Sequence, residues 1–434
     1  MQRRERLKAD AEAAFRAALA GADPRPRVAD WLRRHPGTAE PRGRLAVVAV
    51  GKAACAMAAG VLDARPQLAD TGLVVTKDGH GAGCPEGWDL LETAHPRPDH
   101  RSLSAGAELL GRAGALGEGD ELLLLVSGGA SALVEALPED IPAGDWFAAS
   151  EALVGSGLDI EGINAVRKHC SRLKGGRLAA AAAPARVTAL LLSDVIRDDP
   201  AVIGSGLAAG DASTFGEALA LARSVPAMPA TVIAHLERGA RGELAETPRP
   251  DGLGGVTNAV VATNHLALEA AGALLGERGY RPLLLTSRLQ GEAREVARVL
   301  AAVAMESRAS GSPVPSPAAF LWGGEPWVTL SGEPGVGGRA QELALALADE
   351  LAGAGPAGGL CAGTDGTDGP TGAAGGWADD STRARAEAEG WPVADTLTRH
   401  DSGSLLEALG DRLVTGPTGT NVMDLMVVLT GQPR

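Results

Sequence analysis

Several features that define large protein classes are scarce or absent in this sequence. Its 434 residues include only four cysteines, Cys55, Cys84, Cys170 and Cys361, and no CxxC pair. Neither a disulfide framework nor a zinc site is therefore expected, and a reducing cytoplasm fits. No uninterrupted apolar run reaches about 18 residues, so we expect no membrane span. The net charge of −14 argues against nucleic acid as a partner, because binding it needs a basic surface.

The standard loop patterns of nucleotide-binding and serine enzymes are also missing. Gly51-Lys52 lacks the earlier glycine and the following Ser or Thr of a Walker A loop. No GxGxxG pattern follows a strand, since GSGLAAG at 204–210 has the wrong final spacing. The G-x-S-x-G elbow fails in VSGGASAL, because Val126 precedes Ser127 and no glycine lies two residues after Ser131. A P-loop, a standard dinucleotide fold and a serine nucleophile are therefore disfavoured.

The apolar runs predict an α/β fold with two domains, since the chain is too long for one ordinary core. In the first half, continuous apolar strands alternate with helices, which is typical of a parallel sheet covered on both faces. These predicted strands span 44–50, 72–76, 121–126 and 186–193. The second half predicts strands at 258–264 and 281–287, helices at 265–279, 291–305 and 339–351, a hairpin over 318–332 and two closing strands.

A Pro- and Gly-rich charged stretch within 226–257 indicates a linker between the two domains. We therefore predict a larger Rossmann-like domain with a parallel sheet over residues 1–245. A smaller α/β domain with a mixed sheet is predicted over residues 255–434.

Small-residue loops and lysines occur where predicted strands end, which is where such sheets bind ligands. The backbone N–H groups of Ser127-Gly128-Gly129-Ala130-Ser131 suit a phosphate, and a plain tight turn is the alternative. Lys52 follows the first strand, where its ammonium could reach a phosphate or a carboxylate, or could simply extend into solvent. Only five of the 40 basic residues are lysines, so each internal lysine is a candidate for a role that needs a compact ammonium.

Acidic residues follow two other predicted strands. Asp194, with Asp198 and Asp199 close behind, suits Mg²⁺, which prefers one or two carboxylates together with water and phosphate oxygens. The alternative is a helix cap or a turn. Asp365 and Asp368 lie in the glycine-rich loop GTDGTDGPTG, which could position a metal or accept a proton from a hydroxyl.

Basic residues form one local cluster and one isolated candidate. The segment 164–178 carries Arg167, Lys168, Arg172, Lys174 and Arg177, which indicates an acidic small molecule or, alternatively, a solvated helix face. Arg339 begins a predicted helix, where it is well placed to bind an anion. His95 fits a structural role in a turn better than the role of a base.

Nine segments occur in an order typical of one family: VGKAACAM, ETAHPRPDH, VSGGASAL, INAVRKHCSRLKGGRL, LLSDVIRDDPAVIGSG, GGEPWVTL, GGRAQELALA, GTDGTDGPTGAA and TGPTGTNVMDL. The chain resembles the class II glycerate 2-kinases, known for a MOFRL-type C-terminal domain and often labelled hydroxypyruvate reductases. The resemblance spans roughly residues 7 to 430. It implies ATP-dependent phosphorylation of D-glycerate at the 2-hydroxyl with Mg²⁺, in a cleft between two α/β domains.

The resemblance also assigns residues. The family's essential lysine and arginine fall on Lys52 and Arg339, and the aspartate of its Ser-Asp-Val motif falls on Asp194. Gly372 replaces an aspartate common in the family, so the resemblance implies no carboxylate role at position 372. Ala340 replaces an asparagine of the family's Arg-Asn-Gln-Glu, which indicates a divergent branch and leaves the exact hydroxy-acid substrate open.

These residues combine into a hypothesis for phosphoryl transfer. Lys52, Arg339 and Asp194 are the predicted catalytic residues. The predicted phosphate contacts are Ser127, Gly128, Gly129, Ser131 and Lys174, the predicted substrate contacts are Arg167, Asp365 and Asp368, and the predicted Mg²⁺ ligands are Asp194 and Asp365. The alternatives are an NAD(P)H-dependent hydroxypyruvate reductase, which the missing GxGxxG disfavours, and a non-catalytic sensor of phosphorylated metabolites. We expect a cytoplasmic monomer or homodimer.

Overall fold

The computed structural model describes residues 2–68, 72–330 and 332–433, and the chain divides into two compact units. The N-terminal unit comprises residues 24–262, and the C-terminal unit comprises residues 1–23 together with 263–434. This division differs from the predicted domains at both ends of the first domain. The first helix belongs to the C-terminal unit, and the strand predicted to open the second domain belongs to the N-terminal unit.

The N-terminal unit is built on a six-stranded parallel sheet with the strand order β3-β2-β1-β4-β5-β6. The strands are β1 (Leu45–Val50), β2 (Gly72–Lys77), β3 (Asp89–Thr93), β4 (Glu121–Val126), β5 (Arg186–Leu192) and β6 (Val256–Ala262). The four predicted strands correspond to β1, β2, β4 and β5, and the predicted parallel sheet is confirmed. Every residue of β4 is buried, as expected for a central strand covered on both faces.

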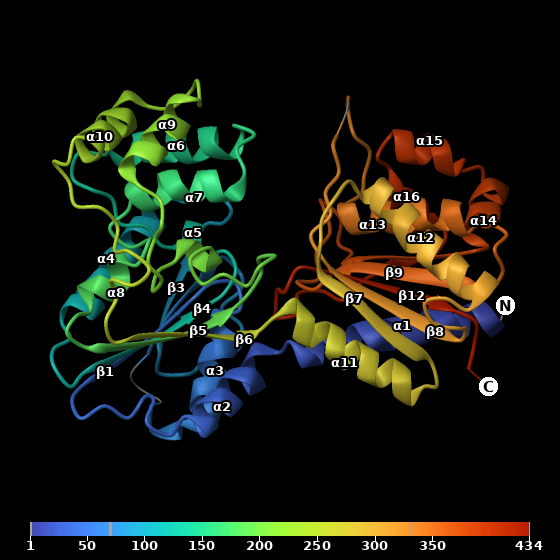
Figure 1. The fold of residues 1–434 in the computed structure, drawn as a ribbon, viewed down its shortest axis with the longest axis horizontal. Helices are drawn as coiled ribbons and strands as arrows, with labels where there is room; N and C mark the ends of the chain where they lie inside the picture. The colour runs from blue at the N-terminus through green and yellow to red at the C-terminus, as the bar shows by residue number, and fades with distance from the viewer. Residues whose placement is uncertain (1, 69–71, 331, 434) are drawn as a thin grey trace. The chain divides into compact units, whose positions relative to one another are not determined.

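Helices cover this sheet on both faces (Figure 1). They are α2 (Pro24–Arg34), α3 (Ala54–Ala64), α4 (His100–Gly114), α5 (Ala130–Leu133), α6 (Ala143–Val154), α7 (Ile160–His169), α8 (Arg177–Ala181), α9 (Phe215–Arg223) and α10 (Ala230–Ala240), with short 3₁₀ turns η1 (Pro66–Leu68) and η2 (Ile203–Ser205). Figure 1 shows α6, α7, α9 and α10 together as a helical subcluster, whose apolar core includes Trp146 and Phe215.

The predicted linker is part of the N-terminal unit. Asp211 N–H donates to Pro248 O at 2.8 Å, and Arg249 Nη1 donates to Ala212 O at 2.7 Å. The chain then enters β6, which pairs with β5 at the edge of the sheet. Local composition indicates a linker between the two domains, but these long-range hydrogen bonds hold the segment against the N-terminal unit.

The C-terminal unit contains a mixed sheet, as predicted, with the order β11-β10-β9-β12-β8-β7. Its strands are β7 (Arg281–Leu289), β8 (Ala318–Gly324), β9 (Ala357–Gly363), β10 (Gly375–Asp379), β11 (Arg412–Leu413) and β12 (Asp424–Thr430). The predicted hairpin over 318–332 is wrong. In the described part of that range β8 is the one strand, and it pairs with β7 and β12, while Trp327 forms a single bridge with Glu292.

Helices also cover both faces of this second sheet. They are α1 (Gln2–Gly21), α11 (Asn264–Glu277), α12 (Ala293–Ser310), α13 (Arg339–Leu351), α14 (Thr382–Ala388), α15 (Val393–Thr398) and α16 (Ser402–Ala408). The buried residues of α1 recur at helical spacing (Leu7, Ala11, Ala14, Phe15, Ala18), and this face lies beside α11 and the sheet. That packing explains why the first helix joins the C-terminal unit. Among the described helices, none has the length and apolarity to cross a membrane.

Candidate functional site

The loops after β1 and β4 interlock at the carboxyl end of the parallel sheet. Lys52 N–H donates to Gly128 O at 2.9 Å, and Ala53 N–H donates to Ser127 Oγ at 3.0 Å. Gly51 has a φ of +129°, and a Cβ there would lie 2.1 Å from Ser127 Oγ. Glycine at position 51 is therefore required for this close approach, which holds Lys52 against the small-residue loop.

Gly129 packs closely against Lys52 and a histidine. Its φ is +87°, and a Cβ at this position would lie 3.1 Å from His95 Cδ2 and 3.4 Å from Lys52 Cγ. Burial is the main cause that lowers the pKa of His95 to about 4, and the charges of Lys52, Lys77 and His80 add to it. The imidazole is therefore neutral at neutral pH, so the positive charge beside Gly129 comes from lysine.

The small-residue loop also presents backbone donors. Among the described residues, the N–H groups of Gly128 and Gly129 have no hydrogen-bond acceptor. Buried or half-buried N–H groups are almost always paired in folded proteins, so such donors are available to an external anion. The predicted loop residues thus lie together with Lys52, and they pack so closely that a side chain at position 129 would crowd His95 and Lys52.

Asp194 lies half-buried directly after Ser193, at the carboxyl end of β5. A neighbouring candidate, Asp199, accepts a hydrogen bond from Ala201 N–H at 2.8 Å and therefore serves a turn. In the described part of the chain, no group of three or more His, Cys, Asp or Glu side chains could hold a metal ion. A closed protein cage for a metal is thus absent there, whereas a single strand-end carboxylate is present.

Lys174 is placed differently from the predicted phosphate contact. Its ammonium donates to Glu135 inside the N-terminal unit, and Ser171 Oγ donates to the same carboxylate at 2.6 Å. Lys174 is 1% exposed, and burial lowers its pKa although Glu135 opposes this shift. These contacts argue against the predicted role, because the charge is already paired in the core.

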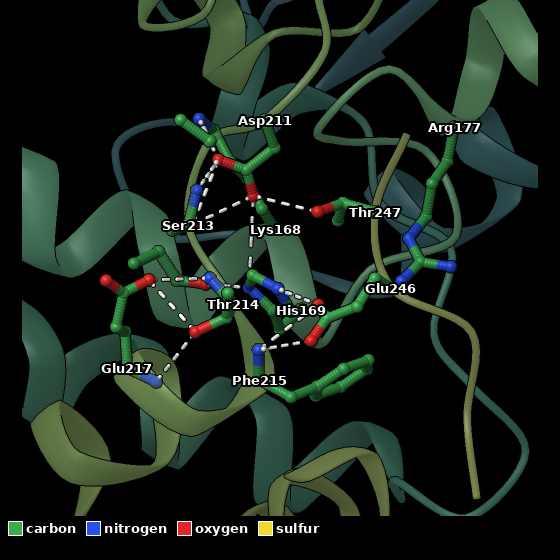
Figure 2. Close-up of polar contacts among 12 residues, drawn as sticks. Lys168, His169, Arg177, Asp211, Ser213, Thr214, Phe215, Glu217, Glu246 and Thr247 are labelled. Carbon is green, nitrogen blue, oxygen red and sulfur yellow. Dashed lines mark hydrogen bonds and ion pairs between the residues drawn. The ribbon is translucent and has the colours of Figure 1, made fainter. Parts of the chain in front are cut away.

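Lys168 of the basic cluster and the neighbouring His169 are also paired internally (Figure 2). Lys168 Nζ donates to Asp211 Oδ1 at 3.2 Å, and His169 Nε2 lies 3.1 Å from Glu246 Oε2. The contact between His169 and Glu246 holds the segment that precedes β6 against α7. The side chain of Arg167 differs from that of Lys168, because it has no hydrogen bond or ion pair within the described residues.

In the C-terminal unit, Arg339 is the first residue of α13 and is held by two carboxylates. Its Nε and Nη2 donate to Asp424 at 2.7 and 3.1 Å, and its Nη1 donates to Glu325 at 2.8 Å. Burial lowers the pKa of Arg339, but Asp424 and Glu325 outweigh it and raise the pKa overall. About a third of the Arg339 side chain is exposed, so an anion can still reach its guanidinium.

Asp424 is the main residue that sequence reasoning missed. It is the first residue of β12 and is 4% exposed. Burial raises its pKa to about 7, Arg339 opposes the shift, and Asp368 and Glu325 add to it. Its segment, TGPTGTNVMDL, was recognised as a motif, but nothing local indicated that this carboxylate binds Arg339.

Asp368 caps α13 from a distant loop. Ala340 N–H and Gln341 N–H donate to its two oxygens at 3.0 and 2.8 Å, and it is 5% exposed. The preceding Gly338 has no side chain to cap the helix, and a Cβ there would lie 2.3 Å from Asp368 Cγ. These bonds argue against the predicted substrate contact and give Asp368 the role of positioning Arg339.

Asp365 lies in the same loop as Asp368 but is half-buried. Its Oδ1 accepts hydrogen bonds from Thr367 N–H and Thr367 Oγ1, both at 2.9 Å. The loop is held by close glycine contacts, since a Cβ at Gly366 would lie 2.0 Å from Gly416 O. Asp365 therefore has a fixed position and remains a candidate ligand.

Comparisons with known proteins cover both units. Residues 10–237 match a family model described as a domain of unknown function, DUF4147, and residues 318–424 match the MOFRL family. A D-glycerate 2-kinase of Thermotoga maritima is 40% identical over 386 residues, covering 89% of this chain and 90% of the relative. An Agrobacterium vitis protein named as a hydroxypyruvate reductase is 40% identical over 420 residues, covering 96% and 93%. The crystal structure of a glycerate kinase from Thermotoga maritima matches with a TM-score of 0.89 and 37% identity, covering 98% of this chain and 100% of that one.

Proposed function

Because the chain belongs to the class II glycerate kinase family, we propose that it transfers a phosphoryl group from ATP to the 2-hydroxyl of D-glycerate. The observation that carries this proposal is the close approach of Lys52 to the loop of Gly128 and Gly129, whose backbone N–H groups have no acceptor in the described residues. This arrangement suits a phosphate better than a nicotinamide cofactor, whose usual glycine pattern is missing.

The residues present fit ATP and Mg²⁺. The backbone donors of Gly128 and Gly129 match phosphate oxygens, and Lys52 lies beside them. Mg²⁺ needs only one or two carboxylates in addition to phosphate oxygens and water, so Asp194 of the N-terminal unit and Asp365 of the C-terminal unit are each candidate ligands without a protein cage. When bound, the ion would neutralise charge on the phosphate oxygens.

Phosphoryl transfer asks the protein for alignment and charge neutralisation. The 2-hydroxyl oxygen of the substrate forms a bond to the γ-phosphorus, the bond to the bridging oxygen of ADP breaks, and the hydroxyl proton is released. Lys52 is the candidate cation of the N-terminal unit for the negative charge on the transferred phosphoryl group, and Arg339 is the candidate cation of the C-terminal unit for an anionic group of a substrate. Asp424 and Glu325 would hold the guanidinium, and the 127–131 loop would hold the nucleotide phosphates.

Release of ADP with D-glycerate, and identification of the product by NMR, test this function. Alanine at Lys52 or at Arg339 is expected to lower kcat by about 10²–10³, the usual loss for one electrostatic donor. Near-normal turnover in both variants would show that the assignment is wrong.

A hydroxypyruvate reductase is the second candidate, because one relative carries that name. Oxidation of NADH in the presence of hydroxypyruvate would support it, and ADP release without NADH oxidation would exclude it. A non-catalytic sensor would bind nucleotide or glycerate and release no ADP. We propose that the protein acts in the cytoplasm as a monomer or homodimer and without nucleic acid.

A further inference from the structure

Arg167 is a half-buried cation without an internal counter-ion. Its two neighbours in α7, Lys168 and His169, face Asp211 and Glu246, yet Arg167 makes no hydrogen bond or ion pair within the described residues. Burial lowers the pKa of Arg167, and Glu135 opposes this only in part. A partly desolvated guanidinium without a partner is costly to keep, so a ligand that pairs with it would offset the cost.

The nearby carboxylate of Glu135 is not available as the partner of Arg167. Glu135 already accepts from the ammonium of Lys174, from Ser171 Oγ and from the backbone N–H of Ala136. With Lys174 and Arg167 positive and Glu135 negative, this cluster has a net charge of +1 inside a protein of net charge −14. The excess charge is positive and favours an anion.

A chain of hydroxyl groups leads from the helix of Arg167 to the candidate phosphate loop. Asn164 lies three residues before Arg167, so the two share a face of α7. Ser205 Oγ donates to Asn164 Oδ1 at 2.9 Å, and Ser205 Oγ lies 2.8 Å from Ser131 Oγ. Ser131 belongs to the loop that contains Gly128 and Gly129.

We propose that the guanidinium of Arg167 forms a subsite for a compact oxyanion on the face of α7 that leads through Asn164 and Ser205 to the Ser131 loop, and that its main occupant is the carboxylate of the 2-hydroxy acid. This inference rests on the proposed function, because it names the group of the substrate that the site recognises. The planar fork of a guanidinium matches the two oxygens of a carboxylate, which a point charge cannot do as well. Arg167 would then explain why an acid, and not the corresponding aldehyde or alcohol, is the acceptor.

Kinetics of Arg167→Gln, Arg167→Lys and Arg172→Gln test the subsite. Arg172 is exposed in the same basic segment, so its replacement removes an equal charge as a control. We expect Arg167→Gln to lower kcat/KM for D-glycerate by about 10- to 100-fold, as for the loss of charged hydrogen bonds, with a smaller loss in Arg167→Lys. The KM for ATP should stay within twofold (about 0.4 kcal/mol) of the unaltered protein. The preference for D-glycerate over D-glyceraldehyde, which lacks the carboxylate, should fall by the same factor.

The outcomes separate the two sources of the anion. A raised KM for ATP with an unchanged KM for D-glycerate would assign the subsite to a nucleotide phosphate and overturn the carboxylate assignment. Values for Arg167→Gln equal to those for Arg172→Gln would overturn the subsite altogether, as would loss of folding in both Arg167 variants. Without ligand, Arg167→Gln should melt no lower than the unaltered protein, because it removes an unpaired charge.

A ligand-induced shift in melting temperature keeps this test separate from the proposed function. If the unaltered protein released no ADP, the proposed function would fail. D-glycerate should still raise its melting temperature, and should not raise that of Arg167→Gln. An equal rise in both proteins would overturn the inference.

Discussion

The contact between Asp424 and Arg339 predicts an unusual dependence of stability on pH. Asp424 is buried at the start of β12 with a pKa of about 7, and its ordinary value is 3.8. Between about pH 4 and pH 7 the folded protein holds a proton on Asp424 that the unfolded chain has released. The free energy of unfolding of the C-terminal unit should therefore fall as the pH rises through this window, and the variant Asp424→Asn should lack this component.

The size of the effect follows from the two pKa values. Each pH unit between 3.8 and about 7 lowers the free energy of unfolding by about 1.4 kcal/mol, so the decrease over the whole window is roughly 4 kcal/mol. Between pH 5.5 and pH 8 only the part up to about pH 7 counts, which is roughly 2 kcal/mol. The contribution of protonated Asp424 to the free energy of unfolding is largest below about pH 4 and is lost above about pH 7.

Urea unfolding at pH 5.5 and at pH 8 measures this difference. The unaltered protein should lose roughly 2 kcal/mol more than Asp424→Asn between the two conditions, in the transition that includes the C-terminal unit. Asp395→Asn, which removes an exposed carboxylate from α15, serves as the control and should behave like the unaltered protein. An equal pH response in the unaltered protein and in Asp424→Asn would refute the reasoning.

Two further substitutions test the N-terminal unit. Gly129→Ala places a Cβ against His95 and Lys52 and adds about 1–2 kcal/mol of left-handed backbone strain. We therefore expect the KM for ATP to rise by about tenfold. An unchanged KM for ATP would contradict the assignment of the 127–131 loop to the nucleotide phosphates. Glu135→Gln leaves the buried ammonium of Lys174 without its counter-ion and should destabilise the protein by about 3–5 kcal/mol in urea unfolding. Glu139→Gln, at an exposed site, should leave stability nearly unchanged, and equal losses in both variants would be evidence against a buried ion pair.

The sequence predicts the first sheet well because its strands are apolar on both faces. The strands β1 and β4 are continuous runs of apolar residues, and a parallel sheet covered by helices on both faces buries such runs. The edge strand β6 was assigned to the wrong unit, because its membership depends on pairing with β5 across an intervening stretch of more than 60 residues. The hairpin after β8 was wrong because a local Gly-Gly-Glu-Pro turn signal does not reveal that β12 occupies the neighbouring position.

The roles of individual side chains were harder to predict for a similar reason. The carboxylate partner of Lys174 lies 39 residues away, and that of Arg339 lies 85 residues away in Asp424. Asp368 looked like a ligand because it lies in an acidic glycine loop, yet it caps a helix 27 residues earlier. Local pattern identifies which residues carry charge, but only the fold decides which charges are already paired.

The identity of the product formed from D-glycerate and ATP tests the central claim most directly. We predict that NMR will show 2-phosphoglycerate accumulating together with ADP, and that Lys52→Ala will lower the rate by about 10²–10³. Formation of 3-phosphoglycerate, or ADP release that is the same with and without D-glycerate, would contradict the account.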